Sequence, residues 1–352
     1  QMLQSEIKSS FIDLGLFLSQ FEFENYQLNP IVKHNDLFYN EMIDLISLSQ
    51  SHNGWFTKDN VCFALQSWSK ALTKENLDKW LNSYNFTTVQ PKKIGLILAG
   101  NIPLVGFHDL LSVLISGHNA IVKLSSNDQH LVKFLVKYLI ALDPNFVQKI
   151  TFIEGKLEGF DAVIATGSNN TSRYFEYYFK DKPNIIRKNR NSVAILTGDE
   201  SKEELEALGK DIFRYFGLGC RNVSKIFIPK DYNFSLFFES IFKFGEIIHY
   251  EKYANNYDYN KAVFLMSNFK LLDNEFLILK EDESYASPIA SLYYEYYENE
   301  AILNHKLSED IEKIQCVVGK NNNTYIPFGK TQEPELWEYA DNVDTIEFLI
   351  NL

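Results

Sequence analysis

The chain has 352 residues, of which 45% are hydrophobic and 23% are charged, a composition typical of a folded protein large enough for two packed domains. Its net charge of −12, without any basic stripe, argues against nucleic acid as a partner, because phosphate binding needs clustered Lys and Arg. No run approaches the roughly 18 apolar residues of a membrane-spanning helix, and the first residues lack the basic and apolar regions of a signal peptide.

The three cysteines, Cys62, Cys220 and Cys316, are odd in number, and their spacings fit neither a disulfide framework nor a zinc site. We therefore expect a reduced, cytoplasmic protein without a metal centre. Cys62 and Cys316 lie in apolar stretches, where a small buried side chain is the default interpretation.

The N-terminal part, residues 1–90, is expected to be helical. Apolar residues recur at three- and four-residue spacing over 7–21 and over 60–81, which predicts two helices. The turn residues at 51–54 separate them.

From residue 93 the pattern changes to strands that alternate with helices. Continuous apolar runs are typical of buried parallel strands, and the alternation predicts a doubly wound parallel sheet. The predicted strands are 94–99, 120–124, 149–154 and 161–166, and the predicted helices are 104–116, 128–141 and 168–179.

The alternation continues less regularly after a polar stretch at 187–191, where we expect the domain boundary. The predicted strands beyond it are 192–197, 223–228, 262–266, 275–280, 289–294 and 314–318, and the predicted helices are 201–216 and 234–244.

The strongest local signal for chemistry is a glycine-rich turn that ends in Cys220. Gly217 and Gly219 let the backbone turn sharply and approach a ligand closely. Arg221 follows directly, and a neighbouring cation raises the thiolate fraction of a thiol. Cys220 is therefore a candidate covalent nucleophile, and a structural cysteine in a surface turn is the alternative.

Asn101 follows the first strand of the alternation, in the turn Asn101-Ile102-Pro103. Ligands bind at the carboxyl ends of strands in open parallel sheets. The Asn101 side-chain amide could donate a hydrogen bond to a developing oxyanion. The alternative is that Asn101 caps the following helix.

Two further turns have residues that suit a nucleotide. Lys123, Ser125 and Ser126 leave the second strand, where they could meet a ribose or a phosphate or could cap a helix. The turn Thr166-Gly167-Ser168 could present backbone N–H groups to a phosphate or could be an ordinary turn. No G-x-G-x-x-G segment follows a strand, which disfavours an ordinary Rossmann dehydrogenase. The histidines form no recognisable triad.

Taken in order, these turns resemble those of the aldehyde dehydrogenase superfamily. A narrower likeness, to the LuxC-type acyl-CoA reductases, the fatty-acid reductase component of bacterial bioluminescence, rests on 220–225 and on the C-terminal segments 328–332 and 339–345. The resemblance spans residues 90–350.

The resemblance implies an α/β fold of the aldehyde dehydrogenase type, with two doubly wound parallel-sheet domains and a helical N-terminal segment. On this basis we expect a helical segment packed on the cofactor domain, a nucleotide-binding domain, a catalytic domain with Cys220 and a C-terminal tail. Their expected bounds are 1–90, 91–190, 191–330 and 331–352.

The resemblance also implies the reaction, which is reduction of a fatty acyl-CoA or acyl thioester to a fatty aldehyde through a Cys220 acyl-enzyme. Asn101 would stabilise the oxyanion. Hydrolytic aldehyde dehydrogenases carry a Glu general base in the segment that corresponds to 187–191, which here has no carboxylate. Its absence favours acyl-CoA reduction over aldehyde oxidation.

The resemblance assigns cofactor binding to residues at two strand ends. NAD-preferring relatives have a Glu three residues after the strand-end Lys, where this chain has Ser126, so we expect NADPH to be preferred although NADH is possible. Asp128 lies nearby and could intrude. The expected cofactor-binding residues are Lys123, Ser125, Ser126, Thr166, Gly167 and Ser168.

Two other functions stay open at this point. One is an acyl-transfer or acyl-carrier subunit of a fatty-acid reductase complex, which forms the acyl-enzyme without reducing it. The other is an inactive structural partner of such a complex. An acyl-activating partner enzyme and a homo-oligomer are also compatible with the sequence.

Overall fold

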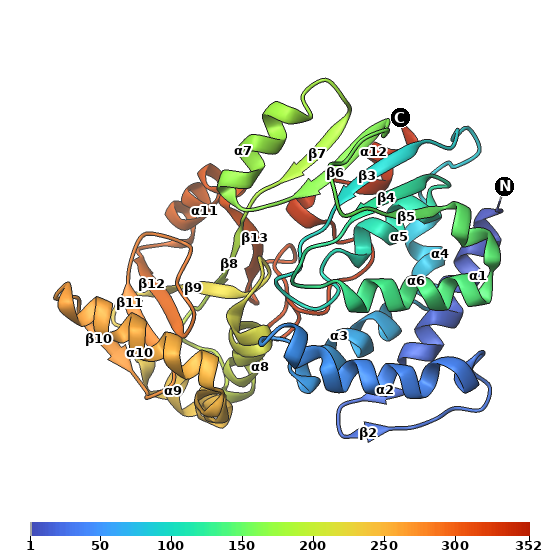
Figure 1. The fold of residues 1–352 in the computed structure, drawn as a ribbon. Coiled ribbons are helices and arrows are strands. Elements are labelled where there is room, and N and C mark those ends of the chain that lie inside the picture. Colours follow the sequence, from blue (N-terminus) through green and yellow to red (C-terminus); the bar gives the residue numbers. More distant parts are fainter. Residues whose placement is uncertain (1) are drawn as a thin grey trace. The chain divides into compact units, whose positions relative to one another are not determined.

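The structure of the chain is a computed structural model, and it describes residues 2–352. These residues divide into two compact units, each built on its own large sheet, and the first unit also has a small two-stranded sheet (Figure 1). The first unit comprises everything up to Lys188 together with Glu335–Leu352, and the second comprises Asn189–Pro334. The backbone therefore passes from one unit to the other twice.

The C-terminal residues 331–352, expected to be a separate tail, are instead shared between the units. Those from Glu335 onward belong to the first unit, because Leu336, Ile346 and Leu349 are buried in its hydrophobic core.

The sheet of the first unit is parallel throughout and has the spatial order β5, β4, β3, β6 and β7. This arrangement confirms the predicted parallel sheet. The sequence pattern missed β7, because its apolar run is only Ile185 and Ile186. The elements are β3 (Lys93–Ile97), α5 (Phe107–Ile115), β4 (Asn119–Lys123), α6 (His130–Leu142), β5 (Ile150–Phe152), β6 (Ala162–Thr166), α7 (Asn169–Tyr178) and β7 (Asn184–Arg187).

The two faces of this sheet pack against different layers. Ile94 and Leu96, alternate side chains of β3, are fully buried in the core that the N-terminal helices share. Gly95 points to the other face, where a Cβ atom would lie 2.6 Å from the side chain of Leu157. Phe175 of α7 is buried on that second face. Both faces are therefore covered, as a doubly wound sheet requires.

The N-terminal helices pack on the first sheet, because Phe11, Phe17 and Trp80 are buried in the same hydrophobic cluster. The predicted single helix at 60–81 is wrong, since Thr73 accepts a hydrogen bond from Asn76 N and caps a new helix. The elements are α1 (Gln4–Leu18), β1 (Phe21–Glu22), β2 (Asn25–Tyr26), α2 (Asn35–His52), α3 (Lys58–Ala71) and α4 (Lys74–Leu81).

The sheet of the second unit has the order β10, β11, β12, β9, β8 and β13, and β10 runs antiparallel to β11 while the other pairs are parallel. Its elements are β8 (Asn191–Ile195), α8 (Lys202–Phe213), β9 (Val223–Pro229), α9 (Phe234–Ile241), α10 (Glu251–Met266), β10 (Leu271–Asp273), β11 (Ile278–Glu281), β12 (Ser291–Tyr297), α11 (Glu300–Glu309) and β13 (Ile314–Val318).

The predicted strand at 262–266 is wrong, because these residues form the last turn of α10. The buried side chains Tyr253, Tyr257, Asn260 and Phe264 recur at three- and four-residue spacing, which is the period of a helix. The short run 262–266 by itself could not reveal this longer pattern.

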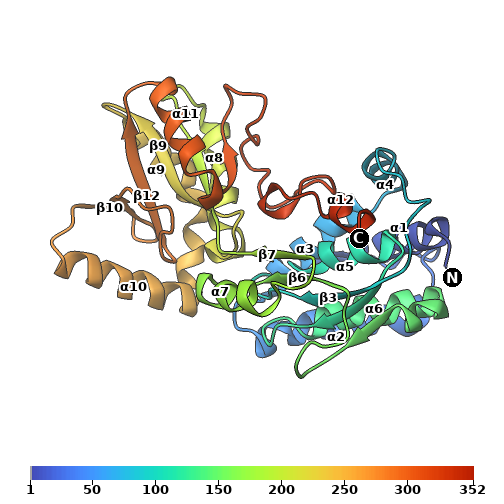
Figure 2. The same cartoon turned by 90° about the horizontal axis from the view of Figure 1, so that it is seen from above.

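A buried ion pair ties the C-terminal segment to the first sheet. Arg187, the last residue of β7, pairs with Asp109 of α5, and both side chains are less than 10% exposed. Arg187 Nη2 also donates a hydrogen bond to Thr345 Oγ1 at 3.1 Å. Thr345 begins α12 (Thr345–Ile350), which lies beside α5 (Figure 2).

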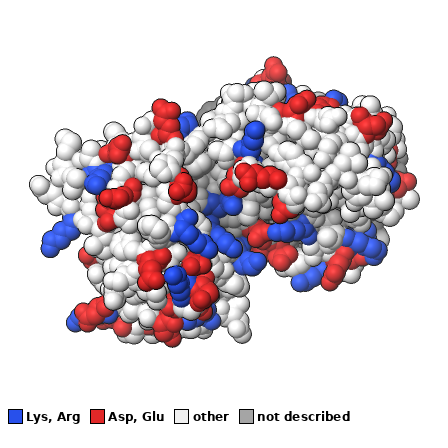
Figure 3. Space-filling model, turned by 90° about the horizontal axis from the view of Figure 1, so that it is seen from below, with Lys and Arg blue, Asp and Glu red and all other residues white. Residues whose placement is uncertain are grey.

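The described surface carries both signs of charge. Acidic and basic side chains are interspersed over the face shown in Figure 3. Between residues 2 and 352 the structure has no helix with the length and apolar character needed to cross a bilayer.

Candidate functional site

Cys220 lies in the connection between α8 and β9 of the second unit. After α8 the chain enters a 3-10 turn, Arg214–Gly217, in which Tyr215 and Phe216 both have a φ of 57°. Gly217 and Gly219 have φ values of 77° and 99°, in the left-handed region that favours glycine. The two glycines of the motif are therefore required by the backbone path, as the sequence predicts.

Packing and hydrogen bonds hold this connection in place. The ring of Phe216 stacks on that of Tyr250 with centroids 4.4 Å apart. Ser192, fully buried in β8, donates a hydrogen bond from its hydroxyl to the carbonyl oxygen of Cys220 at 2.9 Å. The backbone N–H of Cys316 donates to the same hydroxyl at 3.1 Å. The backbone of Cys220 is thus fixed to the neighbouring strands.

The three thiols differ in exposure. Cys62 and Cys316 are buried, with 0% and 3% of their surfaces exposed, whereas Cys220 is only partly buried. Burial raises the pKa of the Cys62 thiol, which keeps it protonated and unreactive. Cys220 is the accessible thiol of the described chain.

Arg221, the cation beside Cys220, is bound by the C-terminal segment of the second unit. Arg221 Nε donates a hydrogen bond to the carbonyl oxygen of Thr331. Asp211 of α8 in turn accepts hydrogen bonds from Thr331 N at 3.1 Å and from Thr331 Oγ1 at 2.9 Å. The sequence analysis missed Asp211, although an Asp on the apolar stripe of α8, beside Leu208, was a visible signal.

Asn101, Lys123 and Thr166 are brought to one edge of the first sheet. Lys123 and Thr166 end β4 and β6, the two neighbours of β3, and Asn101 follows β3. Ile97 of β3 pairs with Lys123 on one side and with Ala165 on the other. The predicted strand-end residues of the first unit therefore lie together.

Asn101 does not cap the following helix, which was the alternative interpretation. The helix α5 begins at Phe107, and Gly106 occupies its N-cap position. The side chain of Asn101 is exposed at the sheet edge. It is available to donate a hydrogen bond to a ligand.

Two of the three serines at this edge accept hydrogen bonds that stabilise their own turns, and the third is exposed. Ser168 is the N-cap of α7, since its hydroxyl accepts from Thr171 N at 3.2 Å. Ser125 Oγ accepts from Asn127 N at 3.2 Å and closes its own turn. The side chain of Ser126 is exposed.

The groups at this edge suit an anionic dinucleotide. Lys123 supplies an ammonium, Ser126 supplies an exposed hydroxyl, and the first turn of α7 presents backbone N–H groups. Phosphates and ribose hydroxyls are the ligands that such donors bind. Residues 2–352 contain no grouping of three His, Cys, Asp or Glu side chains that could hold a metal ion.

Asp128 turns inward and holds the loop that carries Asn101. Its carboxylate accepts the backbone N–H of Leu104 at 2.8 Å, and Leu104 has a φ of 60°. A Cβ atom on Gly100 would lie 2.7 Å from Ser125 Oγ and 3.0 Å from Asp128 N, so the two loops are in direct contact. Because Asp128 is only 5% exposed, its carboxylate is buried rather than presented at this edge of the sheet.

The comparison with known proteins gives the family. A family model described as acyl-CoA reductase (LuxC) matches residues 23–236, more than half of the chain. The chain belongs to the LuxC family of acyl-CoA reductases. The match includes Asn101, Lys123, Thr166 and Cys220, and it ends before the segments 328–332 and 339–345.

A curated relative is the long-chain acyl-protein thioester reductase of Aliivibrio fischeri. It is 24% identical over 273 residues, which cover 70% of this chain and 55% of the relative. The chain thus spans about half the length of the curated relative that it matches.

Solved aldehyde dehydrogenases share the fold of this LuxC family chain. Aldehyde dehydrogenase 21 from Physcomitrella patens has a TM-score of 0.61 at 12% identity, covering 92% of this chain and 75% of its own. An NAD+ complex of an aldehyde dehydrogenase from Bacillus cereus has a TM-score of 0.62 at 12% identity, covering 92% and 73%. These matches confirm the predicted aldehyde dehydrogenase fold.

Two histidines of the chain have structural roles. His108 Nε2 bonds to the carbonyl oxygen of Leu336, and His118 Nε2 bonds to that of Leu349, both at 2.8 Å. Burial lowers the pKa of both imidazoles, so they are neutral near pH 7. These two hydrogen bonds attach residues 335–352 to α5 and to the turn that precedes β4.

We expect Asp128→Asn to change how stability depends on pH. Burial raises the pKa of Asp128 from 3.8 to about 7, so between these values the folded chain retains a proton that the unfolded chain has lost. The free energy of unfolding should fall with rising pH in this window by up to ~1.4 kcal/mol per pH unit from this group. Asp128→Asn removes the pH dependence that comes from this group. The free energy of unfolding of the variant, relative to that of wild type, should therefore rise between pH 3.8 and about 7.

Urea unfolding at about pH 5 and about pH 8 measures the difference. Asp143→Asn is a matched control, because Asp143 also accepts a backbone N–H, from Asn145, but in an exposed turn. A difference between Asp128→Asn and wild type that stays constant with pH would contradict the expectation.

Proposed function

We propose that this chain reduces a fatty acyl thioester, such as a fatty acyl-CoA, to a fatty aldehyde with NADPH, through an acyl-enzyme on Cys220. The observation that carries the proposal is the accessible thiol of Cys220, fixed in a glycine turn beside a cation in a member of the LuxC family.

The first step forms the acyl-enzyme. The Cys220 thiolate attacks the carbonyl carbon of the thioester, a new carbon–sulfur bond forms, and the bond to the leaving thiol breaks. We assign the Asn101 amide and the backbone N–H of Cys220 as donors to the oxyanion. Because the charge develops on the same carbonyl oxygen in both steps, the same donors would serve the whole reaction.

The second step removes the acyl group from Cys220. A nicotinamide cofactor, when bound, would supply the hydride that adds to the carbonyl carbon of the acyl-enzyme. The same donors hold the oxygen of the resulting thiohemiacetal, whose collapse breaks the carbon–sulfur bond, restores the Cys220 thiolate and releases the aldehyde. Lys123 and Ser126 would hold the cofactor at the edge of the first sheet.

The absence of a carboxylate from one segment supports reduction over hydrolysis. The segment 187–191 contains no carboxylate that could activate water. Arg187, which begins it, is buried and paired with Asp109. Without a carboxylate at these positions, the acyl-enzyme would meet one fewer group able to activate water and would persist longer until it is reduced.

We expect Cys220→Ala to abolish aldehyde formation, because it removes the atom that carries the acyl group. Mixing wild-type chain with an acyl-CoA should give an acyl adduct on Cys220, detected by mass spectrometry, and NADPH should then be consumed. Cys62→Ala and Cys316→Ala, at buried thiols, are the matched controls and should keep most activity. An adduct on another residue would contradict the mechanism, and an adduct without NADPH consumption would favour an acyl-transfer subunit.

We expect Asn101→Ala to lower turnover by roughly a hundredfold or more, since removal of one oxyanion donor has effects of this size. Cofactor affinity should change little. Asn127→Ala, at an exposed Asn in the neighbouring loop, is the control and should keep turnover near wild type. Unchanged turnover in Asn101→Ala would remove Asn101 from the mechanism.

We expect wild type to prefer NADPH and Ser126→Glu to shift the preference toward NADH. A carboxylate at this exposed position would repel a ribose phosphate, and a repulsion near 1.4 kcal/mol corresponds to roughly a tenfold change. The ratio of kcat/KM for the two cofactors measures the effect. Ser126→Ala, which removes the hydroxyl without adding charge, should change the ratio less. Equal use of both cofactors by wild type would overturn the assignment.

A further inference from the structure

The C-terminal segment 328–332 has no reacting group of its own, yet it contacts the nucleophile turn. Within the second unit it lies against α8, where a Cβ atom on Gly329 would come within 3.1 Å of the Ala207 Cβ. The φ of Gly329 is 82°, in the left-handed region. This close approach places the backbone of the segment on the helix that leads to Cys220.

One carboxylate organises the segment. Asp211, which is fully buried, accepts hydrogen bonds from Gly329 N at 2.7 Å, Thr331 N at 3.1 Å and Thr331 Oγ1 at 2.9 Å. Burial raises the pKa of Asp211 to about 6, while these donors and the charge of Arg221 act in the opposite direction. Near pH 8 the carboxylate is therefore ionised, and its donors fix the orientation of the Thr331 peptide.

The Thr331 peptide, fixed in this way, binds Arg221. The carbonyl oxygen of Thr331 accepts a hydrogen bond from Arg221 Nε, and Arg221 is covalently adjacent to Cys220. The Cys220 carbonyl is held independently by Ser192. Both the backbone of Cys220 and the cation next to it are thus constrained.

We propose that Asp211 and Thr331 are positioning residues, which fix Arg221 in the turn directly after Cys220 and so let its charge increase the reactivity of the Cys220 thiol. The proposal rests on the role of Cys220 as the nucleophile in the proposed function. A mobile guanidinium would spend less time near the sulfur, and its charge would stabilise the thiolate less.

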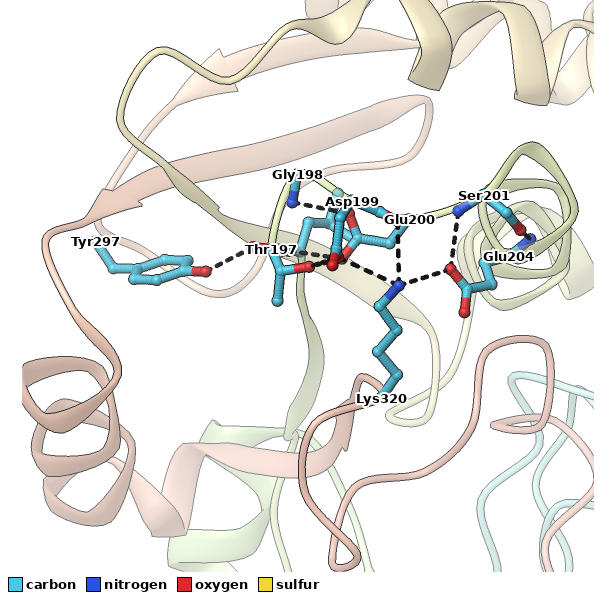
Figure 4. Close-up of polar contacts among 9 residues, drawn as sticks. Thr197, Gly198, Asp199, Glu200, Ser201, Glu204, Tyr297 and Lys320 are labelled. Carbon is cyan, nitrogen blue, oxygen red and sulfur yellow. Dashed lines mark hydrogen bonds and ion pairs between the residues drawn. The ribbon is translucent and has the colours of Figure 1, made fainter.

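A second buried carboxylate in the same unit offers a matched control (Figure 4). Glu200 is 5% exposed, and it accepts from Thr197 N at 2.6 Å and from Gly198 N at 3.0 Å. It therefore resembles Asp211 in burial and in backbone partners. Its partners lie in the loop between β8 and α8, where Lys320 also pairs with Asp199.

The test is the rate at which iodoacetamide alkylates Cys220 in the full chain, followed by mass spectrometry of the Cys220 peptide across a pH series. Thr331→Val and Asp211→Asn should slow alkylation near neutral pH by roughly three- to tenfold and move the pH profile upward. Thr331→Ser, which keeps the hydroxyl, should retain the wild-type profile. Glu200→Gln should also retain it, even where it lowers thermal stability.

A wild-type profile in Thr331→Val would overturn the proposal, as would an equal loss of reactivity in Glu200→Gln. Thr331→Val and Thr331→Ser keep all backbone donors to Asp211, so this pair decides the matter if Asp211→Asn does not fold. Alkylation needs neither acyl thioester nor NADPH. Its outcome is thus separate from failure of the proposed reduction, which would appear as a reactive Cys220 that forms no acyl adduct.

Discussion

Buried carboxylates that accept backbone N–H groups hold the loops on which the proposed chemistry depends. Asp128 binds the N–H of Leu104 and fixes the loop of Asn101. Asp211 binds Gly329 and Thr331 and fixes the segment that contacts Arg221. A carboxylate is costly to bury without donors. Once it is buried, any movement of the loop that removes a donor is unfavourable, and the loop is held in a single arrangement.

The C-terminal part of the chain uses two threonines in comparable ways. Thr331 accepts a hydrogen bond from Arg221 through its carbonyl oxygen, and Thr345 accepts one from Arg187 through its hydroxyl. Each contact lies within one unit. The C-terminal segments 328–332 and 339–345, which have no evident chemistry of their own, therefore each supply a hydrogen-bond acceptor to an arginine side chain.

The sequence predicted those features that depend on local pattern. Apolar runs marked β3, β4 and β6, and the glycines around Cys220 marked a turn whose positive φ values the structure confirms. The pattern could not show that Asp128 turns inward, since its partner Leu104 lies 24 residues away. Thr331 is 120 residues from Asp211, and periodicity says nothing about partners at such separations. Short apolar runs were ambiguous for the same reason, as the end of α10 illustrates.

The two passages of the backbone between the units have a consequence for synthesis on the ribosome. Residues 189–334 form one continuous unit, so all residues of this unit are present once residue 334 has been made. The first unit begins to emerge earlier, but its core includes Leu336, Ile346 and Leu349. Until these residues are made, the pockets that receive them are open and Arg187 lacks Thr345. The first unit is therefore begun first, but its core can be completed only after residues 335–352 have been made.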